Sequence, residues 1–208
     1  MRKTLRRRSY TRGGSTRKKS LFPYAKGVSY DKLMMTPEGE YSITKRDDGK
    51  VLLKHMKSVL GKLSDKSITD LTGNVGGDTI LFGLHFKEVH SIEMNAENFA
   101  ALKNNVETFE LKNVKLYHGD STKLFDWKSD VVYIDAPWGG PDYKNKSNLD
   151  LFLGDIRVDL FVKNILAREN RPDVIFLKVP RNYNFDRLTE FSYVEKFKIR
   201  GFYVVAVK

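Results

Sequence analysis

Three carboxylates stand near the ends of short apolar runs, where each could hold part of a small polar ligand. Asp70 precedes a glycine-containing loop, Glu93 follows the apolar run 88–92, and Asp120 follows the run 114–117. If these runs are parallel strands, their carboxyl ends share one edge of a sheet, which is where open α/β sheets bind ligands. Glu93 could accept both hydroxyls of a ribose, and Asp120 the exocyclic amine of adenine. The set predicts a nucleoside ligand, although acids are also ordinary helix caps and turn residues.

The loop after the first run contains Gly73, Gly76 and Gly77. Glycines let the backbone approach a ligand closely, because no Cβ stands in the way. The spacing differs from the G-x-G-x-x-G pattern that is typical of pyrophosphate-binding turns. The neighbouring Asp70 favours a ligand with a cationic part, and S-adenosylmethionine carries both an ammonium and a sulfonium. We therefore predict S-adenosylmethionine as the cofactor.

The segment Asp135-Ala136-Pro137-Trp138, which directly follows the apolar run 131–134, is the sharpest signal. An exposed tryptophan offers a flat face for a nucleobase, and a positively charged 7-methylguanine would add cation–π attraction. The Asp135 carboxylate and the Ala136 carbonyl could hold the hydrogens of an exocyclic amine, which turns the nitrogen lone pair toward a methyl donor. Proximity and orientation would then supply much of the acceleration. A purely structural turn is the alternative.

The elements that must position these residues alternate along the chain. Apolar runs separated by helical patterns predict an α/β fold, with a mainly parallel sheet, helices on both faces and a C-terminal antiparallel hairpin. The predicted strands are 68–71, 88–92, 114–117, 131–134, 174–177, 193–199 and 202–207, and the predicted helices are 45–62, 78–84, 96–109 and 149–167.

Composition excludes several classes of protein. The 208 residues include no cysteine, which removes disulfide frameworks and thiolate metal sites, and the four histidines show no metal-ligand spacing. No apolar run is long enough for a membrane span, and no apolar stretch typical of a secretory signal follows the basic N-terminus. We expect a monomeric intracellular protein without a metal, and we leave nucleus and cytoplasm open.

Positive charge is concentrated at the N-terminus. The net charge is +11, and residues 1–20 hold nine lysines and arginines and no acid. Such a segment is predicted to be a disordered basic tail, because it has little apolar surface to bury. Attraction to RNA phosphates is the favoured interpretation; a nuclear localisation signal and a solubilising arm are the alternatives.

Four blocks of the sequence resemble the trimethylguanosine synthase family, the cap-specific guanine-N2 methyltransferases that use S-adenosylmethionine. The blocks are GEYSIT at 39–44, DLTGNVGG at 70–77, DAPWGGPDY at 135–143 and PRN at 180–182. The resemblance covers residues 39–208. It implies a Rossmann-like class I S-adenosylmethionine-dependent methyltransferase core at 63–208, preceded by a segment at 21–62 that covers the ligands. The implied substrate partner is RNA with a 7-methylguanosine cap, which would become a di- or trimethylguanosine cap.

The resemblance also implies roles for individual residues. Trp138 would stack on the methylated base, and Arg181 would contact a cap phosphate. The implied catalytic residues are Asp135, Ala136, Pro137 and Trp138. The implied cofactor-binding residues are Thr44, Asp70, Gly73, Gly76, Glu93, Asn105, Asp120 and Asp135. The implied substrate-binding residues are Ser42, Trp138, Tyr143, Arg181 and Asn182.

The chain departs from the family pattern at three positions. Asp135 stands where the family commonly has serine, Ala136 where it has proline, and Glu40 where it has tryptophan. Because aspartate is common at the first position in amino-methyltransferases of other bases, adenine N6 in RNA or DNA is an alternative substrate, and a non-catalytic RNA-binding protein is a further alternative. The second face of the base would be covered by Tyr24, Tyr30 or Tyr41.

Overall fold

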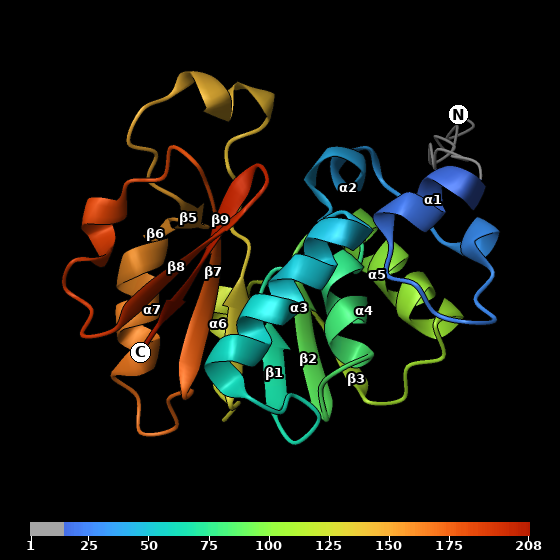
Figure 1. The fold of residues 1–208 in the computed structure, drawn as a ribbon, viewed down its shortest axis with the longest axis horizontal. Coiled ribbons are helices and arrows are strands. Elements are labelled where there is room, and N and C mark those ends of the chain that lie inside the picture. Colours follow the sequence, from blue (N-terminus) through green and yellow to red (C-terminus); the bar gives the residue numbers. More distant parts are fainter. Residues whose placement is uncertain (1–14) are drawn as a thin grey trace, which may run out of the picture.

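A single sheet of seven strands forms the centre of the computed structural model, which describes residues 15–208 (Figure 1). The strand order is β3-β2-β1-β4-β7-β9-β8. The first five strands in this order are parallel, whereas β9 is antiparallel to both β7 and β8. The predicted parallel sheet with a C-terminal antiparallel hairpin is confirmed. The strands are β1 Ser67–Asp70, β2 Glu88–Glu93, β3 Val114–His118, β4 Val131–Ile134, β7 Val174–Pro180, β8 Val194–Ile199 and β9 Phe202–Val207.

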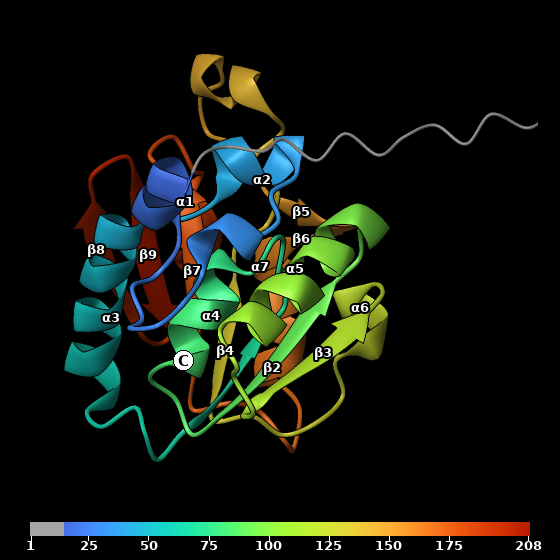
Figure 2. The ribbon, with the colours of Figure 1, turned by 90° about the vertical axis from the view of Figure 1, so that its right-hand side faces the viewer.

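Helices cover both faces of this sheet (Figures 1 and 2). On one face lie α3 Arg46–Leu60, α4 Gly77–Gly83 and α5 Ala96–Thr108. On the other lie the short α6 Ser121–Leu124 and α7 Val158–Leu166. Every residue of the central strands β4 and β7 is buried, as expected for strands that are covered on both sides. Two apolar cores, one on each face, hold the layers together.

The region predicted as one helix over 149–167 is partly extended. β5 Phe152–Leu153 and β6 Ile156–Arg157 form a small antiparallel ribbon, and α7 begins only at Val158. Gly154 at the turn of the ribbon has a φ of +55°, a left-handed conformation that a helix cannot accommodate. The predicted helix therefore starts nine residues too early, because apolar spacing alone does not separate a short ribbon from a helical face.

The N-terminal segment is more ordered than its composition predicts. α1 Ser15–Leu21 is helical, and its Lys18 is buried and donates hydrogen bonds to the carbonyls of Asp31 (3.2 Å) and Leu33 (2.6 Å). The prediction of a disordered tail is thus wrong for residues 15–20, because Lys18 finds carbonyl partners in the following loop. Residues 1–14, which hold the rest of the predicted tail, lie outside the described residues.

Beyond α1, the segment crosses α4 and α5 through the 3-10 turn η1 Tyr30–Lys32 and the helix α2 Pro37–Ser42 (Figure 2). Asn105 of α5 fixes this crossing. Its side chain accepts from the Met34 N–H (2.6 Å) and donates to the carbonyls of Met34 and Val75 (both 2.8 Å). Tyr30 is buried and donates to the Pro23 carbonyl (2.7 Å), so it is unable to cover a substrate base; Tyr24 and Tyr41 are exposed.

Candidate active site

A cavity of about 250 Å³ lies at the carboxyl ends of the parallel strands. Four carboxylates contribute to its wall, namely Glu38, Glu93, Asp120 and Asp135, and no lysine or arginine does. The remaining wall combines amides with apolar side chains such as Leu71, Met94, Pro137 and Leu153. This set of groups suits a ligand with hydroxyls, a flat apolar part and a positive charge, and it disfavours a diphosphate.

Glu93 ends β2 and ties two loops to the cavity. Its carboxylate accepts from the backbone N–H of Asn74 and from that of Asn95, both at 2.7 Å. Burial raises the pKa of Glu93, although these two hydrogen bonds oppose the shift. Each carboxylate oxygen has a second lone pair, so Glu93 can still accept hydrogen bonds from ligand hydroxyls.

Asp120 stands at the N-terminus of α6, after the neighbouring strand β3, and also lines the cavity. It accepts from the backbone N–H (3.0 Å) and the hydroxyl (2.7 Å) of Thr122, and it pairs with Lys123 at 3.2 Å. The Thr122 hydrogen bonds and the nearby lysine hold the pKa of Asp120 below its usual value. Asp120 is therefore an anion that caps a helix and also lines the cavity.

Asp70 lies beneath the glycine loop and is absent from the cavity wall. Its side chain is buried and accepts from the Thr79 hydroxyl (2.6 Å) and the Thr72 N–H (3.0 Å). The Thr79 hydroxyl also lies 2.8 Å from that of Ser91. Burial, the largest cause, raises the pKa of Asp70 to about 7. Asp70, which the sequence predicted to bind the cofactor, therefore holds the glycine loop through these hydrogen bonds.

The loop glycines are required by close packing. A Cβ on Gly73 would lie 2.4 Å from the Ser91 hydroxyl oxygen, and one on Gly76 would lie 2.9 Å from Leu102. Gly76 also has a φ of +94° and caps α4. Both glycines let the loop sit directly on β2 and α5, while the neighbouring Thr72 and Asn74 contribute to the cavity wall.

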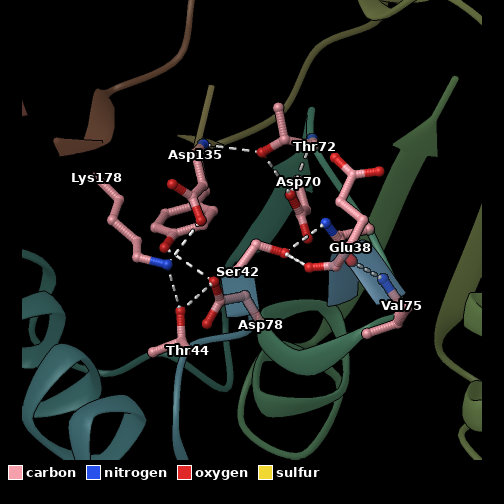
Figure 3. A network of polar contacts seen from close by, with 11 residues as sticks. Glu38, Ser42, Thr44, Asp70, Thr72, Val75, Asp78, Asp135 and Lys178 are labelled. Atoms are coloured by element: carbon pink, nitrogen blue, oxygen red, sulfur yellow. Dashed lines mark hydrogen bonds and ion pairs between the residues drawn. The ribbon is translucent and has the colours of Figure 1, made fainter. Parts of the chain in front are cut away.

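Asp135 begins a buried polar network just beyond β4 (Figure 3). Its Oδ2 accepts from the ammonium of Lys178 (2.6 Å), which also donates to the Thr44 hydroxyl (2.8 Å). The Thr44 hydroxyl donates in turn to Asp78 Oδ2 (2.8 Å), which also accepts from the Tyr133 hydroxyl (3.0 Å). Cofactor contact was predicted for Thr44, but the structure places it in this network behind the cavity wall.

The charges of this network shift the pKa values of its members. Burial raises the pKa of Asp135 to about 6, although Lys178 opposes the shift. Burial is the largest single cause and lowers the pKa of Lys178, but the charges of Asp135, Asp78 and Asp70 and the hydrogen bond to Asp135 together leave that pKa raised. Lys178 is therefore a buried cation at neutral pH.

Trp138 is half-buried, whereas the sequence predicted an exposed ring. Its indole packs against both apolar cores and meets the Tyr143 ring edge-on, with 5.0 Å between the ring centres. The Lys178 ammonium lies 5.6 Å from the centre of the indole ring. The indole N–H is buried without a hydrogen-bond partner, although it lies close enough to Asp135 to lower the pKa of that carboxyl.

The other predicted substrate residues fall into two groups. Asn182 donates to the carbonyls of Tyr143 (2.7 Å) and Lys146 (2.5 Å), and so joins the PRN block to the loop that follows Trp138. Arg181 is exposed and donates to the carbonyl of Arg200 in the β8–β9 turn. Ser42 lies apart from these residues, where it accepts from the Asn74 side chain at 3.1 Å. Asn105, predicted to bind the cofactor, instead holds the N-terminal segment.

Sequence reasoning missed Lys178, Asp78 and Tyr133. A signal for Lys178 was present, because it is the one charged residue in β7, whose seven residues are all buried. Asp78 looked like an ordinary acid in the first turn of a helix, and Tyr133 looked like strand core. Among residues 15–208, no cluster of acids and histidines is arranged to hold a metal ion, and no helix could cross a membrane.

Comparison with known proteins decides the family. The model described as RNA cap guanine-N2 methyltransferase matches residues 65–205. The chain belongs to this family. It is 32% identical to an uncharacterized protein of Acanthamoeba polyphaga mimivirus over 74% of this chain and 62% of that protein. It is 29% identical to the trimethylguanosine synthase of Schizosaccharomyces pombe over 78% of this chain and 71% of that protein.

The family relatives extend beyond the aligned region. For the trimethylguanosine synthase of Saccharomyces cerevisiae, which is 26% identical, the match covers 76% of this chain but 51% of that protein. The chain thus spans between about half and about seven-tenths of the length of these relatives.

Solved structures agree on the fold. A 16S rRNA N2 methyltransferase of T. thermophilus, solved with AdoMet and guanosine, has a TM-score of 0.61 at 19% identity over 77% of this chain and 42% of that chain. A precorrin-6y methyltransferase of Geobacter metallireducens has a TM-score of 0.57 at 16% identity over 86% and 94%. The predicted class I methyltransferase fold is confirmed.

The family and the fold class together confirm S-adenosylmethionine as the cofactor that the sequence predicted. The residues of the cavity fit this cofactor. Glu93 offers acceptors for ribose hydroxyls, Met94 and Leu71 offer apolar surface for a base, and the acidic wall suits a sulfonium and an ammonium.

Proposed function

We propose that this protein transfers a methyl group from S-adenosylmethionine to the exocyclic N2 amine of 7-methylguanosine in an RNA cap. Membership of the cap guanine-N2 methyltransferase family supports the reaction. The observation that carries the proposal is the position of the segment 135–138. Asp135 and Pro137 belong to the wall of the cofactor cavity, and Trp138 follows them directly.

In this proposal the bound cofactor supplies an electrophilic methyl group, and the protein supplies orientation. Asp135 accepts a hydrogen bond from the substrate amine, so that the nitrogen lone pair is directed into the cavity. The methylated amine is acidic and loses its proton readily, so the site needs no strong base. The rate enhancement comes mainly from proximity and alignment of the reacting groups.

Trp138 and Tyr143 form the substrate side of the same site. The two rings meet edge-on at 5.0 Å, and Asn182 anchors the loop that carries Tyr143. An indole next to the transfer point can bind the face of a positively charged base through stacking and cation–π attraction. Asp135 adds a negative charge beside the same base. Exposed Arg181 lies at the end of β7, where it is available to a cap phosphate.

The test is methylation of 7-methyl-GDP by the full chain with labelled S-adenosylmethionine, with mass spectrometry to locate and count the added methyl groups. We expect N2-methylated 7-methyl-GDP, and much slower reaction of GDP and of adenine-containing oligomers. Equal competition by GDP and by adenine oligomers would remove the cap from this proposal. Methylation of adenine N6 alone would establish the alternative amino-methyltransferase.

The two tryptophans of the chain provide a matched pair of variants. Trp127 is also half-buried against the same core as Trp138, but it lies near β2 and β3, with its N–H donated to Thr69. We expect Trp138→Leu to abolish methylation of 7-methyl-GDP and to leave cofactor affinity nearly unchanged. Trp127→Leu should keep the activity at temperatures where it is folded. Comparable loss of activity in both variants would refute the role of Trp138.

A further inference from the structure

Lys178 is a buried cation that the proposed reaction does not yet use. Its side chain is 4% exposed, within a strand whose seven residues are all buried. Burying an ammonium is costly unless its charge is paired and its protons are bound. Lys178 meets both conditions, because it pairs with Asp135 at 2.6 Å and donates to the Thr44 hydroxyl at 2.8 Å.

The direction of the hydrogen bonds fixes where the ammonium lies. The Thr44 hydroxyl donates its only proton to Asp78, so its lone pairs remain free to accept from Lys178. The rings of Trp138 and Phe202 lie 5.6 and 5.1 Å from the same ammonium. Figure 3 shows Lys178 reaching Asp135 from one side and Thr44 from the other.

The consequence for Asp135 is that one oxygen is committed and one is available. Oδ2 accepts from Lys178, and no geometrically complete hydrogen bond among residues 15–208 engages Oδ1, although the indole N–H of Trp138 lies near the same carboxylate. A carboxylate held by one oxygen against a fixed cation has a defined orientation, which an amine donor can then exploit. Asp135 is also part of the cavity wall, so its carboxylate is accessible from the side where a ligand would bind.

We propose, on the basis of the function proposed above, that Lys178 is a positioning residue for methyl transfer. It keeps Asp135 ionised and fixes its carboxylate, so that Oδ1 accepts a hydrogen bond from the substrate amine. The residue acts through Asp135 and has no contact with the transferred methyl group.

The charges around Asp135 determine the sign of the effect. Burial and the charge of Asp78 on α4 raise the pKa of Asp135, whereas Lys178 and the indole N–H of Trp138 lower it. Phe202 on β9 and the Thr44 hydroxyl carry no charge, and Asp70 on β1 and Tyr133 on β4 are close enough for the charge of Asp135 to raise their pKa values. Removing the Lys178 ammonium must therefore move the protonation of Asp135 from about pH 6 to a higher pH.

A direct titration tests this without any activity. In a Trp127→Phe background Trp138 is the only tryptophan, so its fluorescence reports the charge beside it. We expect an emission change with a midpoint near pH 6 in this background, and a midpoint at least one pH unit higher when Lys178→Met is added. Lys196→Met is the matched control, because Lys196 also lies over aromatic rings, Phe185 (4.2 Å) and Tyr203 (5.0 Å), on the outer strand β8. An unchanged midpoint in the Lys178→Met variant would overturn the proposal.

Kinetics on 7-methyl-GDP complete the test. We expect Lys178→Met to lower kcat at pH 7 by about twofold or more, to shift the acid limb of the pH–rate profile upward, and to recover activity as the pH rises. Lys178→Arg, which keeps the charge, should keep the original limb. If Lys178→Met does not fold, Thr44→Val removes the hydroxyl that holds the ammonium and should shift the limb in the same direction by less. A wild-type protein that titrates as expected but leaves 7-methyl-GDP unmethylated would refute the proposed function alone.

Discussion

Ionisation of the buried Asp70 should make the protein less stable as the pH rises. The side chain is 1% exposed, and its pKa is about 7 in the folded protein, against 3.8 for an unperturbed carboxyl. Because the folded pKa is the higher one, the native state holds a proton that the unfolded chain has already released. Between pH 5 and pH 8 this difference costs about 3 kcal/mol of the free energy of unfolding, at about 1.4 kcal/mol per pKa unit.

Asp70→Asn should remove this pH dependence without breaking the fold. The asparagine carbonyl can accept from the Thr72 N–H, and the asparagine amide can donate to the Thr79 oxygen. The Thr79 hydroxyl can then turn its proton to Ser91, whose oxygen lies 2.8 Å away. We therefore expect the free energy of unfolding of the variant, relative to that of the wild type, to rise by about 3 kcal/mol from pH 5 to pH 8.

The assay is urea denaturation of both proteins at pH 5, 6, 7 and 8 without cofactor. Asp120→Asn is the control, since the pKa of Asp120 is lowered and its contribution is lost only as the pH falls below the usual carboxyl range. That variant should therefore show a constant difference from the wild type between pH 5 and pH 8. A constant difference for Asp70→Asn over the same range would refute the argument from burial.

Three further predictions follow from packing and hydrogen bonding. Gly73→Ala should destabilise the fold by about 1–3 kcal/mol in urea denaturation, because its Cβ would lie 2.4 Å from the Ser91 oxygen, whereas Gly201→Ala, with open space around it, should be neutral. Asn105→Ala removes four hydrogen bonds, three of them to the backbone of Met34 and Val75, at about 1 kcal/mol each, and should expose residues 21–44 to limited proteolysis well before the sheet. Glu93→Gln places an amide N–H against the backbone N–H of Asn74 or Asn95, so it should weaken S-adenosylmethionine binding at least tenfold. Calorimetry measures this affinity, and equal affinities of the variant and the wild type would contradict the prediction.

The sheet could be predicted from the sequence because its strands are short runs, apolar at the centre and alternating at the edge, between turn or helix signals. β4 and β7 show the reason most clearly, since full burial on both faces demands nearly continuous apolar sequence. The ribbon before α7 was not predictable in this way. Its apolar side chains can pack into the core from an extended backbone as well as from a helix. Gly154 is the residue that indicates a turn.

The candidate site was predictable where a residue stands at a strand end and unpredictable where partners come from far along the chain. Glu93, Asp120 and Asp135 follow strands, and all three contribute to the cavity wall. Lys178 and Thr44 are separated by 134 residues, so nothing local indicates their hydrogen bond. Trp138 was expected to be exposed because it is flanked by proline and glycines. In the structure it is partly buried, because its ring packs against both apolar cores.

The helix α2 and the turn that follows it contribute to the site although they precede residues 65–205, the range that the family model matches. The residues matched by the family model begin at 65. Glu38 nevertheless contributes to the wall of the cavity, and the Thr44 hydroxyl accepts a hydrogen bond from the Lys178 ammonium. A fragment that begins at residue 65 would keep all strands of the sheet but would lack Glu38, so the cavity would lose part of its wall. Truncated or chimaeric versions of this chain should accordingly include residues 21–44 together with the sheet.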